Sequence, residues 1–295
     1  MGRYDATPSK LMGQNFLIDK TALKKIIEAA ELTPKDTVLE VGPGIGTLTQ
    51  ELAKRADRVI AIEKDAAMVE ILRETMQEYG NLEIIHDDIL KNLEFSNFKL
   101  NSNAPAGSPS GSSKFQISNY KVVANIPYYL TSHLIRKFLE EKETPERIVL
   151  MIQKEVAQRI CAKPPSPPHQ SSKGTSGVGA RMSILAVSVQ FYAKPEIISY
   201  VKKECFWPSP KVDSAIIKIT PKAEKGSIDA ELFFKIVKAG FSHPRKQLAG
   251  NLSGTLKISK KEVQKWLLKN NIQPEQRAET LSLESWVKLV DSLGK

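Results

Sequence analysis

The 295-residue sequence contains only two cysteines, Cys161 and Cys205, and no Cys-x-x-Cys spacing. A disulfide framework or a cysteine-based zinc site is therefore not expected, and this usage is typical of a reducing cytoplasm. Its four histidines are scattered, which argues against a metal centre. Long apolar runs are missing, and residues 1–10 lack the apolar core of a secretion signal. We therefore expect a soluble, cytoplasmic protein without membrane spans.

An excess of negative charge is also absent, because the formal net charge is +10 and the pI is about 9.4. This balance favours a polyanionic partner, most simply nucleic acid, with an anionic membrane surface as the alternative. The excess is uneven, since residues 221–295 hold 14 Lys and Arg against 8 Asp and Glu. We predict a main domain over residues 1–220 and a small basic helical domain over residues 221–295.

Short apolar segments alternate with amphipathic ones along the first half of the chain. The pattern predicts strands at 38–41, 58–62 and 82–85, with helices between them. This order is typical of a parallel sheet covered on both faces, so we expect a Rossmann-like α/β fold. Two Ser-, Pro- and Gly-rich segments read as surface insertions, and they lie at residues 101–114 and 163–179. The remaining pattern predicts strands at 122–124, 147–152, 197–201 and 212–219, and helices at 131–143, 154–160 and 182–189.

The stretch Asn125-Ile126-Pro127-Tyr128 directly follows one of these apolar strands. In an open α/β sheet the carboxyl ends of the strands form the ligand-binding edge. The Asn125 side-chain oxygen and the backbone carbonyl of Ile126 or Pro127 can accept both hydrogens of an exocyclic amine, while a tyrosine face stacks on the attached ring. These groups suit an adenine held by its N6 amine. The alternative is a plain strand-to-helix turn, because Asn and Pro are turn residues.

A glycine-rich loop with Gly42, Gly44 and Gly46 lies between a predicted strand and a predicted helix. Missing side chains let backbone N–H groups approach a ligand closely. Glu63 ends the next strand, where a carboxylate can accept hydrogen bonds from both hydroxyls of a ribose. A nicotinamide nucleotide and S-adenosylmethionine share these requirements, so the loop and the acid predict a nucleoside cofactor without distinguishing the two.

Asp88 ends the third strand, and its position permits two interpretations. Its carboxylate can accept from the amine of the cofactor's adenine, or it can cap the helix that follows. Asp87 takes the binding role if the strand register differs by one residue.

These motifs fall at four successive strand ends, and this arrangement resembles that of the adenine-N6 methyltransferases. More closely, the chain resembles the ribosomal RNA small-subunit adenine dimethyltransferase family. The likeness covers nearly the full length, and its ordered matches lie at residues 13–17, 40–49, 152–157, 189–192, 206–215 and 241–252.

The resemblance implies S-adenosylmethionine as cofactor. It implies Asn125, Pro127 and Tyr128 as the catalytic motif, with Tyr128 and Phe206 as aromatic walls around a flipped adenine. The second insertion replaces a short family loop that lies near the substrate, so that loop's RNA contacts do not carry over. The implied cofactor contacts are Asn15, Leu17, Gly42, Gly44, Glu63, Asp88 and Asn125.

A cluster of positive charge at His243-Pro244-Arg245-Lys246 lies within the basic domain. Arg245 and Lys246 are candidates for phosphate contacts, and an exposed turn without ligand is the alternative.

The activity implied by the resemblance is N6-dimethylation of two adjacent adenosines near the 3′ end of small-subunit (16S) rRNA, in a precursor of the small ribosomal subunit, by a monomer. Three alternatives stay open. They are a large-subunit rRNA methyltransferase of the macrolide-resistance type, a non-catalytic ribosome assembly factor, and a nicotinamide-dependent dehydrogenase.

Overall fold

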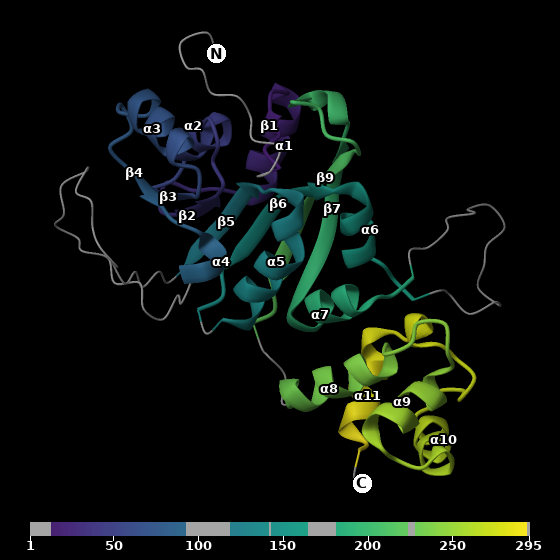
Figure 1. Cartoon of the computed structure of the whole chain (residues 1–295). Helices are drawn as coiled ribbons and strands as arrows, with labels where there is room; N and C mark the ends of the chain where they lie inside the picture. The colour runs from purple at the N-terminus through teal and green to yellow at the C-terminus, as the bar shows by residue number, and fades with distance from the viewer. Residues whose placement is uncertain (1–12, 93–118, 142, 165–180, 224–227, 294–295) are drawn as a thin grey trace. The chain divides into compact units, whose positions relative to one another are not determined.

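The computed structural model describes residues 13–92, 119–141, 143–164, 181–223 and 228–293 (Figure 1). The chain forms two compact units. The first comprises Met1–Ala157 and Lys194–Pro221, and the second comprises Gln158–Ala193 and Lys222–Lys295. None of the helices in the described ranges is long and apolar enough to cross a bilayer.

The first unit contains a seven-stranded sheet with the strand order β4-β3-β2-β5-β6-β9-β7. Strands β4 to β6 in this order pair in parallel, and β9 pairs antiparallel with β6. The predicted α/β sheet, with helices between its parallel strands, is thus confirmed. Its strands are β2 (Thr37–Val41), β3 (Arg58–Glu63), β4 (Leu82–His86), β5 (Tyr120–Asn125), β6 (Arg147–Gln153), β7 (Ala193–Val201) and β9 (Ser214–Pro221).

The helices over Lys20–Ala30 and Ala66–Thr75 begin where the sequence supplies capping side chains. Asp19 accepts a hydrogen bond from the Ala22 N–H at 2.7 Å, and Asp65 accepts one from the Ala67 N–H at 3.0 Å, as expected of N-caps. The elements between the strands are α1 (Lys20–Ala30), α2 (Thr47–Ala53), α3 (Ala66–Thr75), α4 (Ile89–Asn92), η2 (Tyr128–Leu130), α5 (Thr131–Glu140), α6 (Lys154–Ile160), which reaches into the second unit, and η3 (Lys203–Cys205).

A second, two-stranded sheet, which the sequence pattern did not predict, joins distant parts of the first unit. It pairs β1 (Phe16–Leu17) antiparallel with β8 (Phe206–Trp207). Leu17 and Phe206 enter the apolar core on one face of the large sheet, alongside Val38, Val123 and Val149. The amino-terminal segment is thereby held against the residues that follow β7.

The second unit is helical and has its own core. Trp286, Phe233 and Leu267 are fully buried there. Gly240 allows the close approach of Trp286, because a Cβ atom at this position would lie 2.4 Å from the indole ring. Its elements are α7 (Ile184–Tyr192), α8 (Ala230–Gly240), α9 (Leu248–Leu256), α10 (Lys260–Lys269), η4 (Ala278–Thr280) and α11 (Leu283–Asp291).

The division into units differs from the predicted boundary after residue 220 in one respect. Residues 158–193 group with the helical unit and not with the sheet. The reason is α7, whose Ala186 and Val187 pack in the helical core, while Phe191 stacks on Phe233 with 4.2 Å between ring centroids. The predicted insertion at 101–114 lies outside the described residues, as does that at 163–179 except for its first two residues.

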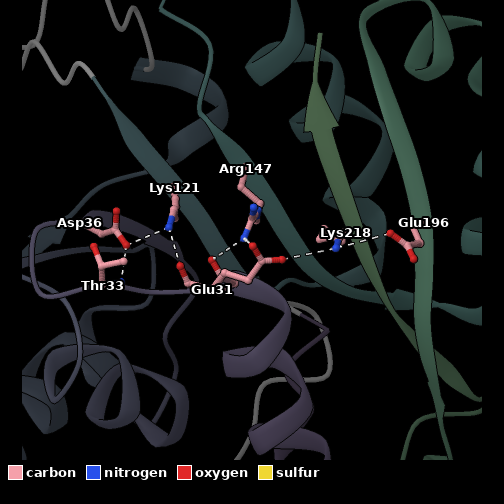
Figure 2. Close-up of polar contacts among 8 residues, drawn as sticks. Glu31, Thr33, Asp36, Lys121, Arg147, Glu196 and Lys218 are labelled. Carbon is pink, nitrogen blue, oxygen red and sulfur yellow. Dashed lines mark hydrogen bonds and ion pairs between the residues drawn. The ribbon is translucent and has the colours of Figure 1, made fainter. Parts of the chain in front are cut away.

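Opposite the carboxyl edge of the sheet, a polar network joins α1 to the strands (Figure 2). Lys121 donates to the Glu31 carbonyl at 2.7 Å and forms an ion pair with Asp36 at 2.8 Å. The Glu31 carboxylate in turn pairs with Arg147 at 2.7 Å and Lys218 at 3.6 Å. Burial acts to raise the pKa of Asp36, but hydrogen bonds from Lys121 and the Thr33 N–H outweigh it and lower that pKa.

Glu40 is a buried acid in the middle of this fold. Its side chain on β2 is 1% exposed, and within the described part of the chain its Oε2 has no hydrogen-bond partner. Burial raises the pKa of Glu40 to about 8; the adjacent Thr49 hydroxyl acts to lower it, and the Glu63 charge acts to raise it. The carboxyl is therefore neutral in the folded protein at pH 7.

Replacing Lys121 by Met should destabilise the first unit by about 1–3 kcal/mol, because the half-buried Asp36 and the Glu31 carbonyl lose their donor. The loss should shrink as the pH falls below about 4, where Asp36 takes up a proton first in the unfolded chain and, at lower pH, in the folded protein. Urea unfolding of the variant and the wild type at several pH values measures this loss of unfolding free energy. The matched variant Lys24→Met, at a side chain that is 76% exposed, should change stability by less than about 0.5 kcal/mol. Equal effects of the two substitutions would contradict a structural role for Lys121.

Replacing Glu40 by Gln should change how stability depends on pH. Folded Glu40 keeps its proton up to about pH 8, whereas the ordinary pKa of the group is 4.5. Unfolding releases that proton between these values, so wild-type stability falls as pH rises through this window. The Glu40→Gln variant cannot release this proton on unfolding, so its stability lacks this fall with pH. Its stability relative to wild type should therefore rise by up to about 1.4 kcal/mol per pH unit between about pH 5 and 8, then level off.

Denaturant unfolding at a series of pH values measures this difference. Glu28→Gln on α1, whose side chain is 62% exposed, is the control, and its stability difference should stay flat over the same range. A flat difference for Glu40→Gln as well would show that Glu40 is ionised in the folded protein.

Candidate functional site

A pocket in the first unit lies at the carboxyl ends of β2, β3, β4 and β5. It is bounded by the amino-terminal segment around β1, by the glycine loop and by the residues after β5. All predicted cofactor-contact residues line this one pocket, together with Pro127, Tyr128 and Phe206. The lining residues that the sequence analysis did not single out as ligand contacts include Gln14, Phe16, Glu40, Lys64 and Tyr129.

The glycine loop follows β2 in a conformation that side chains disfavour. Gly42, Gly44 and Gly46 have φ values of 65°, 58° and 84°. At Gly44 the reason is also spatial, since a Cβ atom there would lie 2.7 Å from the Phe16 ring. The loop backbone therefore passes directly beneath the amino-terminal segment, and its amides border the pocket.

Glu63 is held rigidly at the end of β3. One carboxylate oxygen, Oε1, accepts the N–H groups of Lys64 and Asp65 at 2.8 Å each, and Oε2 accepts the Gly44 N–H at 3.1 Å. Burial raises the pKa of Glu63, and these three amides oppose that rise. Because each oxygen has two lone pairs in the carboxylate plane, Oε2 retains one for a ligand hydroxyl and Oε1 is filled. The expected acceptance from both ribose hydroxyls would require a shared hydrogen bond.

Asp88 acts as a helix cap in the structure. Its Oδ1 accepts the Leu90 N–H at 3.1 Å, and its Oδ2 forms an ion pair with Lys64 at 3.0 Å. Burial acts to raise the pKa of Asp88, but the Lys64 and Leu90 donors outweigh it and lower that pKa. The carboxylate is thus charged and faces the pocket, so capping and ligand binding are compatible at this residue.

Asn125 is oriented by a hydrogen bond to the amino-terminal segment. Its Nδ2 donates to the backbone carbonyl of Asn15 at 3.0 Å. A carbonyl accepts only from a donor, so this contact assigns the amide nitrogen to Asn15 and leaves Oδ1 as an acceptor. The Pro127 carbonyl already accepts the Leu130 N–H at 3.0 Å. In the described ranges the Ile126 carbonyl makes no hydrogen bond, so it is the better second acceptor of the two predicted alternatives.

The ring of Tyr128 is anchored at its hydroxyl. Its Oη lies 2.8 Å from Oγ of Ser214, a fully buried residue at the start of β9. Burial raises the pKa of Tyr128, the Ser214 hydrogen bond acts to lower it, and the charge of Asp213 acts to raise it. The phenol is therefore neutral at pH 7, and Tyr128 lines the pocket. Phe206 forms another wall and is 3% exposed.

Two pocket-lining residues, Gln14 and Phe16, were not predicted as ligand contacts, although they lie within residues 13–17, one of the stretches that match the resembled family. Gln14 donates from Nε2 to Asp65 Oδ2 at 2.8 Å, and Phe16 covers Gly44. Their position inside a matched motif was the available signal. Tyr129 and Lys64 follow predicted site residues directly in sequence, and their own residue types carried no signal.

Arg245 and Lys246 belong to the second unit and do not line the pocket. They belong to the exposed turn between α8 and α9. Asn251 fixes this turn, because its Nδ2 donates to the carbonyls of Gly240 at 2.7 Å and His243 at 3.0 Å.

No group of three or more His, Cys, Asp or Glu side chains suited to a metal ion occurs among the described residues.

The chain is similar to known proteins over nearly its full length. The family model described as "Ribosomal RNA adenine dimethylase" matches residues 8–295. A Ribosomal RNA small subunit methyltransferase A from Dehalococcoides mccartyi is 42% identical over 292 residues, which is 98% of this chain and 89% of that protein. The protein of the same name from Alkaliphilus oremlandii is 41% identical, covering 99% and 94% of the two chains. Its namesake from Geobacillus kaustophilus is 36% identical, covering 99% and 93%.

Solved structures include two relatives that match nearly end to end. The 23S rRNA methyltransferase ErmE superposes with a TM-score of 0.68 at 27% identity, covering 95% of this chain and all of that one. A dimethyladenosine transferase from Plasmodium falciparum superposes with a TM-score of 0.66 at 27% identity, covering 93% and 95%. Because the family model matches almost the whole sequence and relatives of 36–42% identity cover it nearly end to end, the chain belongs to the ribosomal RNA adenine dimethylase family.

Proposed function

We propose that this protein transfers two methyl groups to N6 of each of two adjacent adenosines near the 3′ end of small-subunit rRNA. The observation that carries the proposal is Asn125, whose Nδ2 is engaged by the Asn15 carbonyl and whose Oδ1 is left to accept an amine hydrogen. The choice of the small-subunit RNA is supported by the names of relatives that are 36–42% identical, against 27% for the 23S rRNA enzyme.

The pocket suits S-adenosylmethionine, the cofactor of this family. At Gly44 a Cβ atom would collide with the Phe16 ring, so only a glycine lets the loop backbone border the pocket here. Glu63 keeps one lone pair for a ribose hydroxyl. Asp88 offers a charged acceptor to an adenine amine. Residues Asn15 and Leu17 would close the pocket from the amino-terminal side. When bound, the cofactor supplies a sulfonium-activated methyl group with a good leaving group.

The chain's own residues prepare the nucleophile. An adenine N6 lone pair is delocalised into the ring and is a weak nucleophile. Asn125 Oδ1 and the Ile126 carbonyl would each accept one N–H, which favours a pyramidal nitrogen with its lone pair directed at the methyl group. Because the methyl group already carries a leaving group, alignment is the main requirement and no strong base is needed. A neutral Tyr128 agrees with this mechanism.

The target base must leave its stack before it can enter the pocket, at a cost of a few kcal/mol. Stacking on an aromatic side chain contributes about 1–3 kcal/mol per base and offsets much of that cost. The Ser214 hydrogen bond fixes the Tyr128 ring, so stacking needs no further ordering of that side chain. After one methylation the amine retains a single N–H, and one acceptor suffices to hold it for the second transfer.

The helical unit supplies the contact to RNA in this proposal. Arg245 and Lys246 are exposed on a turn whose backbone Asn251 holds in place. A fixed pair of cations suits the phosphate backbone of a folded rRNA. The substrate is a precursor of the small ribosomal subunit, bound by a monomer in the cytoplasm, where the two free cysteines also fit.

Asn125→Ala should lower kcat by about 10²–10³-fold while subunit binding persists, because it removes an acceptor aimed at the reacting amine. The assay is transfer of labelled methyl groups to unmethylated small subunits, followed by nucleoside analysis for N6,N6-dimethyladenosine. Asn125→Asp is the matched variant: it keeps an acceptor but cannot donate to Asn15, so it should also lose most activity.

Three results would contradict the proposal. Label in large-subunit RNA would favour the 23S-type activity, and unchanged transfer by Asn125→Ala would remove the assigned role. Wild-type binding to subunits without any transfer would favour an assembly factor.

Replacing Arg245 and Lys246 by Gln should weaken binding to small subunits and reduce the slope of log affinity against log salt by about 1 per lost phosphate contact. Affinity for S-adenosylmethionine should not change, because neither residue lines the pocket. Lys261→Gln, an exposed lysine on α10, serves as the charge control. A slope that falls equally in the control would show that the effect is one of net charge alone.

A further inference from the structure

Most of the exposed large apolar side chains among the described residues belong to the first unit. Among the described residues, six such side chains are more than 40% exposed, and only Leu268 belongs to the second unit. Tyr129 lines the pocket mouth. Ile18 follows β1 and donates its N–H to the Cys205 carbonyl at 2.9 Å. Of the other three, Tyr200 (51% exposed) lies near the end of β7, and Trp207 (43%) and Val212 (46%) lie in the connection from β7 to β9.

This connection is rigidly held despite its lack of long strands. Trp207 pairs across β1–β8 and stacks on Phe16 with 6.4 Å between ring centroids. The Ser209 hydroxyl donates to the Lys203 carbonyl at 2.9 Å, and Asp213 Oδ1 accepts the Lys203 N–H at 3.2 Å. Exposed aromatic groups on a fixed backbone lose little entropy when they bind, which is the property of a preformed contact surface.

Cations accompany these aromatic groups. Lys154 Nζ lies 5.2 Å from the centroid of the Tyr200 ring, and Lys154 donates its backbone N–H to the Asp213 carbonyl at 3.0 Å. Lys202, Lys203 and Lys211 are exposed. Within the described ranges, none of these three lysines lies within ion-pair distance of a carboxylate. Their charges are therefore available to an external anion.

The surface adjoins the proposed adenine pocket through two direct links. Trp207 follows Phe206, a pocket wall, and Asp213 precedes Ser214, which anchors Tyr128. Unpaired lysines mixed with exposed aromatic rings are typical of sites for single-stranded nucleic acid, where rings stack on bases and cations track the backbone. Lysine is depleted in protein–protein interfaces, so this composition argues against a protein partner.

We propose that the exposed side chains of residues 200–213, with Ile18 and Lys154, bind the single-stranded nucleotides that flank the target adenosine. This inference rests on the proposed function, since it assumes that an adenosine enters the adjacent pocket. The surface would hold neighbouring nucleotides unstacked while the target base lies against Tyr128. It thus assigns recognition of the local RNA strand to the first unit, separately from the basic turn of the second.

The test measures binding of the full-length protein to a short single-stranded oligoribonucleotide with a central adenosine pair, and to unmethylated small subunits. Tyr200→Leu and Trp207→Leu should each weaken oligonucleotide binding by about tenfold, because they remove ring stacking. Tyr200→Phe and Trp207→Phe keep a ring and should restore most of the affinity. The double variant Lys202→Gln, Lys203→Gln should lower the salt slope by about 1.4, at about 0.7 per contact to a single strand.

Leu268→Ser removes an exposed apolar group from the second unit and Lys24→Gln removes a cation from α1; both should leave oligonucleotide affinity unchanged. Affinity for S-adenosylmethionine, measured on each Tyr200 and lysine variant, should equal that of wild type. Wild-type affinity in the Leu and lysine variants, with normal methyl transfer by the wild type, would overturn this inference and spare the proposed function. Absence of methyl transfer by the wild type would instead overturn the proposed function.

Discussion

The hydrogen bond from Asn125 Nδ2 to the Asn15 carbonyl joins two segments that are 110 residues apart. It decides which end of the carboxamide faces a ligand, and therefore whether the pocket presents an acceptor or a donor. The acceptor requires that Asn15 stay in place, and that in turn requires the short β1–β8 pair, in which Leu17 lies opposite Phe206. Chemistry at the end of β5 thus depends on two strands of two residues each.

This dependence explains what sequence reasoning could and could not predict. The periodic strands and the convergence of Gly42, Glu63 and Asn125 follow from local patterns, and the structure has them. The β1–β8 pair has no periodic signal, because two residues cannot display an alternation. The grouping of residues 158–193 with the helical unit was not predicted. The apolar residues of α7 indicate that this helix is buried, but they do not indicate which of the two cores it packs in.

Tyr128 shows the same limitation at the level of one side chain. Its place after β5 was evident from sequence, but its orientation comes from Ser214, which reaches it only because β9 runs antiparallel beside β6. The reversal of one strand brings residues that follow the β7–β9 connection back to the carboxyl edge. The exposed Trp207 lies in that connection, directly after Phe206 of the pocket wall.

Charge is distributed so that one protein can receive both a cation and a polyanion. The ionisable side chains lining the pocket are Lys64 and four acids, Glu40, Glu63, Asp87 and Asp88, of which Glu40 is held neutral by burial, although the chain as a whole carries +10. Phosphates are repelled from such a lining, whereas a sulfonium cofactor and an uncharged base are not. In the proposed complex, Lys202, Lys203 and Lys211, which form no ion pair within the described ranges, attract the backbone outside the pocket. A flipped base is the part of an RNA that can enter an acidic pocket while its phosphates remain on a basic exterior, so the charge pattern itself favours chemistry on a base over chemistry on the backbone.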